Sequence, residues 1–350
     1  MHEARVLVVD DSAAMRALFS DVLEQTRNIT VVGTAASAAE ARDQIALLRP
    51  NVVTLDVEMP GMSGIDFLAE LMESKPIPVV MLSSLTQSGT ETSLKAYELG
   101  AVECFPKPLK ATPEQFAKTV GKLGKIVLAA ANSNVKERRH GQPRAAAAAA
   151  AAAVAAHGFT WNGHIVALGT SMGGIDALTQ LLAHFPANCP PTVIVLQSEP
   201  ALVDTFINRQ AADLPCKIVH AKDGASLTPG TIHIASDPDK HVVFEPGSPP
   251  RLRMVMREPV DGARPSATLL FGTMARAGVA AVGGVLTGMS ADGAKGLRMM
   301  KDAGCRTFVE DPASAIVGEA PAAAVAAGAG EKVLPLDQLG AAIIACCSQG

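Results

Sequence analysis

A short buried strand that ends on a carboxylate constrains this chain more than any other feature. The run Val52–Leu55 is apolar or β-branched, which is typical of a strand inside a sheet, and Asp56 follows it directly. Pro60 and Gly61 then force the chain to turn. Ligands of an open α/β sheet bind at the carboxyl ends of its strands, so we expect Asp56 to lie at a binding edge.

A second buried strand, Ala4–Val9, ends on the pair Asp10 and Asp11. Each of these acids taken alone could be a helix cap. Three carboxylates at neighbouring strand ends repel one another unless a cation neutralises them, and oxygen ligands of this kind suit Mg²⁺. The sequence therefore favours a metal site over a set of caps.

Two further strand ends supply groups that suit an anion. Residues 79–82 form a predicted strand that is followed by the hydroxyl of Ser83. Residues 101–105 form another, and the ammonium of Lys107 follows it between two prolines. Acid pair, central aspartate, hydroxyl and lysine thus come in that order, each after a strand.

This order resembles the receiver domain of two-component response regulators, over residues 1–125. The resemblance implies that Asp56 accepts a phosphoryl group from a histidine kinase, a step in which a carboxylate nucleophile needs cations beside it. It implies that Ser83 and Lys107 pair with the phosphoryl oxygens. It also implies that Mg²⁺ is held by three carboxylates and one backbone carbonyl, those of Asp10, Asp11, Asp56 and Glu58.

Cys104 departs from the receiver pattern, because such domains usually carry an aromatic residue there that swings inward on phosphorylation. A thiol is smaller than a ring. We therefore expect a weaker response to phosphorylation, read out in a different way.

Composition bounds the remaining alternatives. A length of 350 residues predicts about two domains. The net charge of −4 and the 3% aromatic content argue against nucleic-acid binding. The six cysteines show no metal-ligand spacing and are expected to be reduced thiols. With no signal peptide and no apolar run suited to membrane insertion, we expect a soluble, cytoplasmic protein.

Strands and helices alternate through both predicted domains, with an alanine-rich linker at residues 126–160 between them. Residues 1–125 predict a doubly wound parallel sheet of the flavodoxin-like type. Its expected strands are 4–9, 29–35, 52–56, 79–82 and 101–105, and its helices 12–27, 38–48, 64–72, 92–99 and 113–128. Residues 161–350 predict a second, Rossmann-like α/β domain. Its expected strands are 165–168, 192–196, 217–220, 231–235, 241–244, 252–256, 280–286 and 305–310, and its helices 175–182, 265–277, 292–303, 319–327 and 336–347.

The first strand of the second domain leads into a glycine-rich turn, Gly169–Gly174. It fits the G-x-S-x-G pattern between a strand and a helix, which presents Ser171 as a nucleophile. Such glycines can also cradle a dinucleotide, although no acidic residue ends a second strand about 20 positions on. A turn without any chemical role is the third alternative.

A second marker follows the strand at 280–286, where glycine comes before a carboxylate, Asp292, at a helix start. Asp292 is either an N-cap or the residue that orients a catalytic base for Ser171. The sequence pattern leaves both roles open.

Together with the receiver, these segments resemble the chemotaxis methylesterase family (CheB-type) along the whole chain. Supporting segments are Lys222-Asp223-Gly224, Pro229-Gly230, Lys240-His241 and Arg264-Pro265-Ser266. The family hydrolyses glutamyl methyl esters on chemoreceptors and often deamidates receptor glutamines, so methylated chemoreceptors are the expected substrate or partner. The resemblance implies that Ser171 and Asp292 are the ends of a Ser–His–Asp triad, with oxyanion amides near Met172 and Met289.

The middle of that triad does not match. The family has Gln-His-Met-Pro where this chain has Gln197-Ser198-Glu199-Pro200, and a hydroxyl such as that of Ser198 is not a base near pH 7. The family's threonine beside the nucleophile is Met172, and residues 261–268 depart from its Asn-x-His-Arg-Pro-Ser-Val-Asp segment. His241 is the candidate substitute base, and Glu199 is a weaker one.

Two hypotheses of different class follow. In one, phosphorylation of Asp56 controls an active carboxylic-ester hydrolase. In the other, the same architecture carries a degenerate esterase site and acts as a binding protein or phosphate sink. A DNA-binding regulator is disfavoured, because no basic or helix-turn-helix output region follows the receiver.

Overall fold

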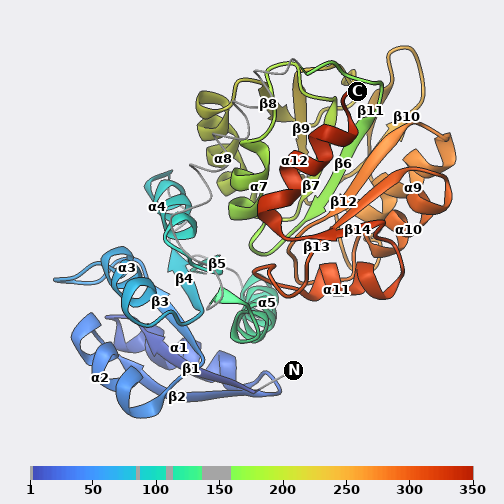
Figure 1. Cartoon of the computed structure of the whole chain (residues 1–350). Coiled ribbons are helices and arrows are strands. Elements are labelled where there is room, and N and C mark those ends of the chain that lie inside the picture. Colours follow the sequence, from blue (N-terminus) through green and yellow to red (C-terminus); the bar gives the residue numbers. More distant parts are fainter. Residues whose placement is uncertain (1–2, 84–86, 108–112, 136–158, 350) are drawn as a thin grey trace. The chain divides into compact units, whose positions relative to one another are not determined.

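The computed structural model describes residues 3–83, 87–107, 113–135 and 159–349. The chain divides into two compact units, Met1–His140 and Gly141–Gly350 (Figure 1). The last helix of the first unit, α5, continues to Ala131, which lies inside the predicted linker. Residues 136–158 of that linker lie outside the described part of the chain, so the domain limits at 125 and 160 stay predictions.

The first unit is the predicted five-stranded parallel sheet, in the order β2-β1-β3-β4-β5. Its strands are β1 (Ala4–Val9), β2 (Ile29–Ala35), β3 (Val52–Asp56), β4 (Val79–Ser83) and β5 (Glu103–Pro106). Its helices are α1 (Ala13–Glu24), α2 (Ala38–Leu48), α3 (Gly64–Ser74), α4 (Gln87–Glu98) and α5 (Pro113–Ala131). The order reverses at β1, whose neighbours are β2 and β3. The carboxyl ends of β1 and β3 therefore flank the crevice where such sheets bind ligands.

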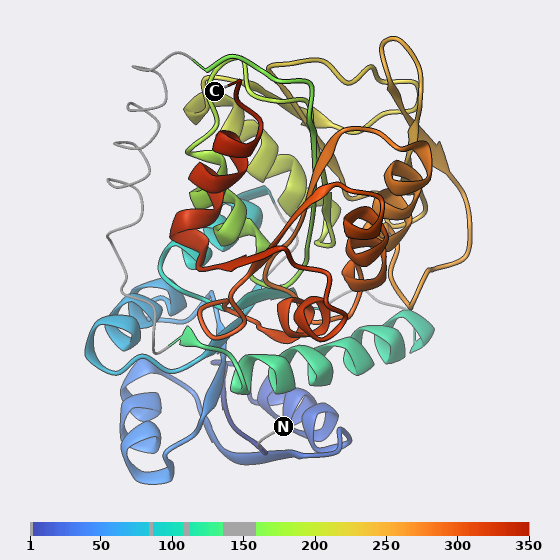
Figure 2. The ribbon, with the colours of Figure 1, turned by 45° about the vertical axis from the view of Figure 1, so that its right-hand side comes forward.

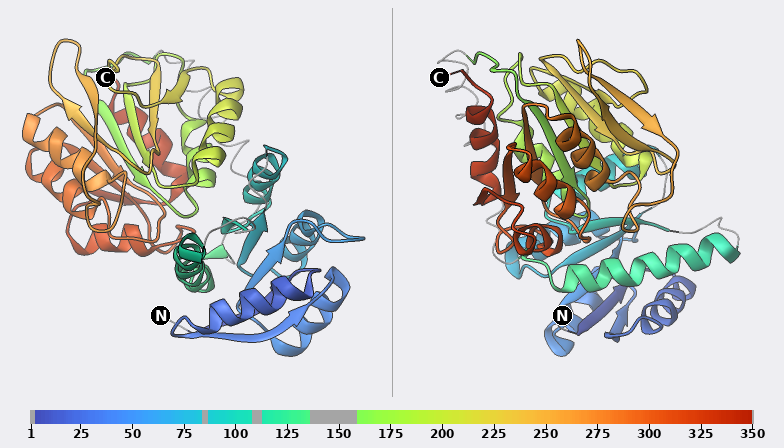
Figure 3. Two further views of the ribbon diagram at one scale, coloured as in Figure 1. Left: turned by 180° about the vertical axis from the view of Figure 1, so that it is seen from behind. Right: turned by 90° about the vertical axis from the view of Figure 1, so that its right-hand side faces the viewer.

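Burial explains why these strands read as continuous apolar runs. Every residue of β3 and of β4 is buried, as expected for parallel strands covered on both faces. Helices α1 and α5 pack together on one face of the sheet, and α3 and α4 pack together on the other (Figure 3). Ser12 caps α1, since its hydroxyl accepts a hydrogen bond from the Met15 amide.

The second unit holds a seven-stranded parallel sheet in the order β14-β13-β12-β6-β7-β9-β8, and a separate antiparallel pair, β10-β11. The strands are β6 (Ile165–Thr170), β7 (Thr192–Leu196), β8 (Lys217–His220), β9 (Thr231–Ala235), β10 (His241–Glu245), β11 (Arg251–Val255), β12 (Ala281–Val285), β13 (Arg306–Glu310) and β14 (Lys332–Leu334). The helices are α7 (Gly174–Leu182), α8 (Pro200–Asp213), α9 (Ala267–Ala277), α10 (Ala294–Asp302), α11 (Glu319–Ala326) and α12 (Leu336–Cys346). The predicted α/β architecture of both units is confirmed.

Helices α7 and α12 pack together on one face of this sheet, and α9 and α10 pack together on the other (Figure 2). The order reverses at β6, which pairs with β12 on one side and β7 on the other. The loops after β6 and β12 therefore meet at the switch point of the sheet. None of the helices in the described ranges has the length and hydropathy that a membrane span requires.

Candidate phosphoacceptor and esterase sites

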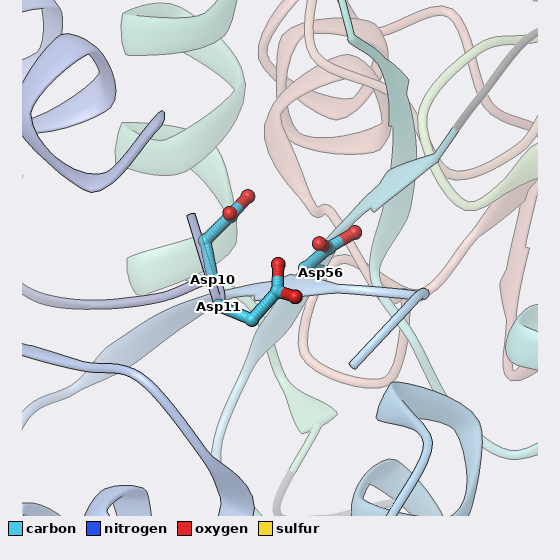
Figure 4. A group of neighbouring side chains, drawn as sticks. All are labelled: Asp10, Asp11 and Asp56. Carbon is cyan, nitrogen blue, oxygen red and sulfur yellow. The ribbon is translucent and has the colours of Figure 1, made fainter. Parts of the chain in front are cut away.

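Three carboxylates converge at the switch point of the first unit. One oxygen from each of Asp10, Asp11 and Asp56 lies within 4.8 Å of the others, and Figure 4 shows the three side chains together. Asp10 and Asp56 are buried, whereas Asp11 is exposed. An acidic pocket with one solvent-facing oxygen donor is typical of an Mg²⁺ site, because this cation takes few protein carboxylates and keeps several waters.

Lys107 neutralises two of these acids. Its Nζ lies 2.7 Å from Oδ2 of Asp56 and 2.9 Å from Oδ2 of Asp10. Burial raises the pKa of Asp56 above its ordinary value, and the ammonium of Lys107 offsets this only in part. Burial would lower the pKa of Lys107, but its bonds to the two carboxylates outweigh this and raise it. The lysine therefore stays charged beside the predicted phosphoacceptor.

Backbone amides fix the acids in place. The Ser12 amide donates to Oδ1 of Asp10 at 3.0 Å, and the Glu58 amide donates to Oδ1 of Asp56 at 3.2 Å. Glu58 thus lies beside the cluster, while its carbonyl as a metal ligand stays a prediction. Ser83 ends β4, and its buried Oγ accepts a hydrogen bond from Ser93 Oγ at 3.3 Å.

Cys104 is buried on β5, and its neighbour is an aromatic residue that sequence reasoning missed. The Cys104 amide donates to the hydroxyl of Tyr97, on α4, at 3.1 Å, and that hydroxyl donates to the carboxylate of Glu103. The Cys104 thiol donates to the carbonyl of Ser93 at 3.6 Å. The available signal was that Tyr97 is the only tyrosine in the chain.

In the second unit, Ser171 lies in the tight turn between β6 and α7, as the elbow pattern predicts. Its Oγ accepts a hydrogen bond from the Met289 amide at 3.1 Å, so the turn after β6 and the loop after β12 meet at this hydroxyl. Gly173 has φ of 77°, a left-handed conformation that favours glycine. A Cβ on Gly288 would lie 2.6 Å from Ser171 Oγ, so only glycine permits this approach.

Thr287 holds the two loops together, a role that the sequence did not reveal. Its carbonyl accepts from Thr170 Oγ1 at 2.8 Å, and its own hydroxyl donates to the Met172 carbonyl at 3.0 Å. Its amide donates to the buried carboxylate of Glu310 at 2.7 Å. Met172 and Met289, the predicted oxyanion residues, are both positioned through these loops.

Asp292 is 7% exposed and is held at the start of α9. Its carboxylate accepts from Ser266 Oγ at 2.6 Å, the Ala267 amide at 2.7 Å, Gln197 Nε2 at 2.9 Å and the Thr268 amide at 3.1 Å. Two bonds to each oxygen fill the acceptor capacity of a carboxylate. Asp292 therefore binds the first amides of α9, whereas α10, the helix that follows it in the chain, has Gly293 as its N-cap and no side-chain cap. The role of Asp292 beside Ser171 stays a prediction.

His241 is fully buried near this shell but is bonded to backbone groups. Its Nδ1 accepts from the Ser266 amide at 3.2 Å, and its Nε2 donates to the Glu258 carbonyl at 3.1 Å. Within residues 159–349, no histidine is hydrogen-bonded to Ser171 or Asp292. These contacts engage both ring nitrogens with backbone groups, and His241 as a substitute base stays a prediction.

Comparisons with known proteins show the family to which the chain belongs. The family model described as CheB methylesterase matches residues 166–343, and that of the response regulator receiver domain matches residues 6–119. The chain is 43% identical over 347 residues to the protein-glutamate methylesterase/protein-glutamine glutaminase 1 of Caulobacter vibrioides, covering 98% of each chain. This chain belongs to the CheB methylesterase family.

Further similarities agree with that membership. The CheB-family chain is 43% identical over 342 residues to the protein-glutamate methylesterase/protein-glutamine glutaminase of Rhizobium etli, covering 97% of this chain and 96% of the relative. The crystal structure of the Thermotoga maritima CheB methylesterase catalytic domain matches 53% of this chain and 98% of its own, with TM-score 0.50 and 25% identity. The protein is thus a response regulator with a receiver domain and a CheB methylesterase domain.

Proposed function

We propose that this CheB-family protein is a phosphorylation-controlled regulator of chemoreceptors whose esterase turnover is reduced by the loss of the triad base. Its relatives are named protein-glutamate methylesterase and protein-glutamine glutaminase, so glutamyl methyl esters of chemoreceptors are the proposed ligands. The contact between Ser171 Oγ and the Met289 amide supports a retained ester-binding cleft.

The surroundings of Asp292 carry the proposal of reduced turnover. The carboxylate is bonded to Ser266, Gln197 and two amides of α9, and to no imidazole among residues 159–349. Losing the histidine of a serine hydrolase triad costs about 10⁶-fold in turnover, roughly 8 kcal/mol of barrier. An oxyanion hole alone retains about 10³-fold over water. Binding of the ester thus survives better than its hydrolysis.

The receiver half of the proposal rests on the acidic pocket. Asp56 is the proposed phosphoacceptor, and a histidine kinase is the proposed donor. Asp10, Asp11, Asp56 and the Glu58 carbonyl would hold Mg²⁺, which when bound offsets the negative charge of the phosphoryl group. Lys107 already contacts Asp56 at 2.7 Å, and Ser83 ends the next strand, so both suit the phosphoryl oxygens.

A full hydrolase is the second candidate, and one observation favours it. Ser266 joins His241 to Asp292, because its amide donates to the imidazole and its hydroxyl to the carboxylate. A rearranged His241 would need to leave both of its backbone partners before it could act as a base.

Two experiments test the proposal. Incubation with acetyl phosphate and Mg²⁺ should give one phosphorylated species on a phosphate-retarding gel, absent in Asp56→Asn and in the presence of a chelator.

The substitution Ser198→His restores the histidine that the family has at this position. It should raise methanol release from methylated receptor above the wild-type rate. Recovery is expected to be partial, because Met172 and Ala263 also differ from the family pattern. A phosphorylated band in Asp56→Asn would refute Asp56 as the phosphoacceptor. An unchanged rate of methanol release in Ser198→His would contradict the proposal that the missing histidine alone reduces turnover.

A further inference from the structure

Position 104 of β5 carries a thiol in place of an aromatic ring, and an aromatic side chain of α4 contacts it. Tyr97 is buried at 3% exposure, and its hydroxyl is bonded to two residues of β5, accepting from the Cys104 amide at 3.1 Å and donating to Glu103. Burial raises the pKa of this phenol well above its ordinary value, so the hydroxyl remains a donor at neutral pH. One end of α4 is therefore tied to β5 through a ring that belongs to the helix.

The same helix is tied to β4 one turn earlier. Ser93 lies four residues before Tyr97, so the two side chains share one face of α4. Ser93 Oγ donates to Ser83 Oγ at 3.3 Å, and the Ser93 carbonyl accepts from the Cys104 thiol at 3.6 Å. Burial raises the pKa of the Cys104 thiol, which keeps it protonated as a donor. A continuous set of hydrogen bonds thus joins Ser83 to Tyr97.

We propose that α4, through Ser93 and Tyr97, reads the phosphorylation state of Asp56 in this chain. The inference rests on the proposed role of Asp56 and of Ser83. When Ser83 Oγ moves to donate to a phosphoryl oxygen, the hydrogen bond that it accepts from Ser93 lengthens or breaks, and a contact of α4 with β4 changes. The hydrogen bonds of α4 to β5, from the Cys104 thiol to the Ser93 carbonyl and between Tyr97 and β5, remain, and the surroundings of the phenol change as the helix shifts. The moving aromatic is on α4, where receivers of the usual pattern have it on β5.

A single tyrosine makes this measurable in the full-length protein. Biosynthetic incorporation of 3-fluorotyrosine gives one ¹⁹F resonance, that of residue 97, because the chain holds no other tyrosine. Beryllofluoride with Mg²⁺ serves as the phosphoryl mimic. We expect the resonance to shift in the wild type and to stay in place in Asp56→Asn.

Variants on α4 distinguish an effect carried by the hydrogen bonds of Ser93 from a general destabilisation of the receiver domain. Ser93→Ala removes the donor to Ser83, and we expect it to reduce the ¹⁹F shift by roughly threefold or more. Ser93→Thr keeps the hydroxyl and should keep most of the shift. Lys95→Ala, at an exposed position of the same helix, is the matched control and should behave as the wild type.

Each outcome has a distinct meaning when phosphorylation by acetyl phosphate is measured on the same samples. If Asp56 is phosphorylated and the Tyr97 resonance does not move, the inference is overturned while the proposed function stands. If Asp56 is not phosphorylated, the proposed function itself fails. An unchanged shift in a folded Ser93→Ala also overturns the inference, and if that variant does not fold, the wild-type resonance with and without beryllofluoride still decides.

Discussion

At the scale of single residues, the burial of His184 makes the stability of the second unit depend on pH. It lies just after α7, is 5% exposed, and its Nδ1 has no hydrogen-bond partner in the described part of the chain. Burial lowers its pKa below the ordinary 6.5, and the carboxylate of Asp337 opposes this only in part. The folded state therefore holds His184 neutral at pH values where the unfolded chain would protonate it.

We predict that the stability of the second unit falls as the pH drops below about 6.5, since the unfolded state then binds the extra proton. His184→Phe, which cannot titrate, should flatten this acid-side slope. His233, whose pKa burial also lowers, should leave part of the slope in place. Urea unfolding followed by the fluorescence of Trp161, the only tryptophan, measures it. The same slope in the variant and the wild type would contradict the prediction.

The positions of Ser171, the Asp10–Asp11–Asp56 cluster and Asp292, and the departure at Ser198, were visible in the sequence, because each follows a strand or replaces a motif residue. Thr287 and Tyr97 were not. Their roles depend on which loops and helices meet in space. The local sequence around a threonine after a strand, or a tyrosine in a helix, does not predict its hydrogen-bond partners. The full hydrogen-bonded shell of Asp292 was likewise outside what residue spacing predicts.

At the scale of elements, two glycines of α5 form a matched pair. Gly121 has open space around its Cα, with nothing within 4 Å of an added Cβ. A Cβ on Gly124 would overlap the Thr26 hydroxyl and lie 2.9 Å from Thr26 Cβ, where α5 packs on α1. A substitution by alanine therefore places its methyl group in open space at Gly121 and in a crowded contact at Gly124, one helical turn away.

We predict that Gly121→Ala stabilises the first unit by about 0.5–1 kcal/mol, because alanine loses less backbone entropy in a helix. Gly124→Ala should destabilise it by about 1–3 kcal/mol, because the added methyl overpacks the contact between helices. Denaturant unfolding followed by the ¹⁹F resonance of fluorotyrosine at position 97 reports this unit. Equal changes in the free energy of unfolding for the two substitutions would show that the contact between α1 and α5 has room for the added methyl group.

Some elements escaped sequence prediction for physical reasons. The three residues of β14 are largely exposed and become a strand only by pairing with β13. Helix α8 was not predicted, although Pro200 begins it and Leu202 and Phe206 are buried with helical spacing. The sheet order, with β9 between β7 and β8, depends on long-range pairing that local pattern does not encode.

At the scale of the whole molecule, each unit carries one natural reporter. Tyr97 lies in the first unit, and Trp161 lies in the second, where its Nε1 donates to the His164 carbonyl at 2.7 Å. Each unit has its own hydrophobic core, so we expect each to unfold as a separate cooperative transition.

We predict that Mg²⁺ at about 100 times its Kd stabilises the transition reported at Tyr97 by about 2.7 kcal/mol and leaves the Trp161 transition unchanged. Asp11→Asn removes an exposed acid, so it should spare folding and weaken the Mg²⁺ effect. A shift of equal size at Trp161 would show that the two units unfold together or that Mg²⁺ acts elsewhere.

Methanol release from methylated chemoreceptor, by the full-length protein incubated with acetyl phosphate and Mg²⁺, tests the central claim of a cleft without its base. Compared with a relative that retains the histidine, we expect turnover to be lower by roughly 10³-fold or more, and Ser171→Ala to change it little, because the nucleophile contributes little once its base is lost. Turnover equal to that of such a relative, abolished by Ser171→Ala, would contradict the account, and its loss in His241→Ala would identify the substitute base.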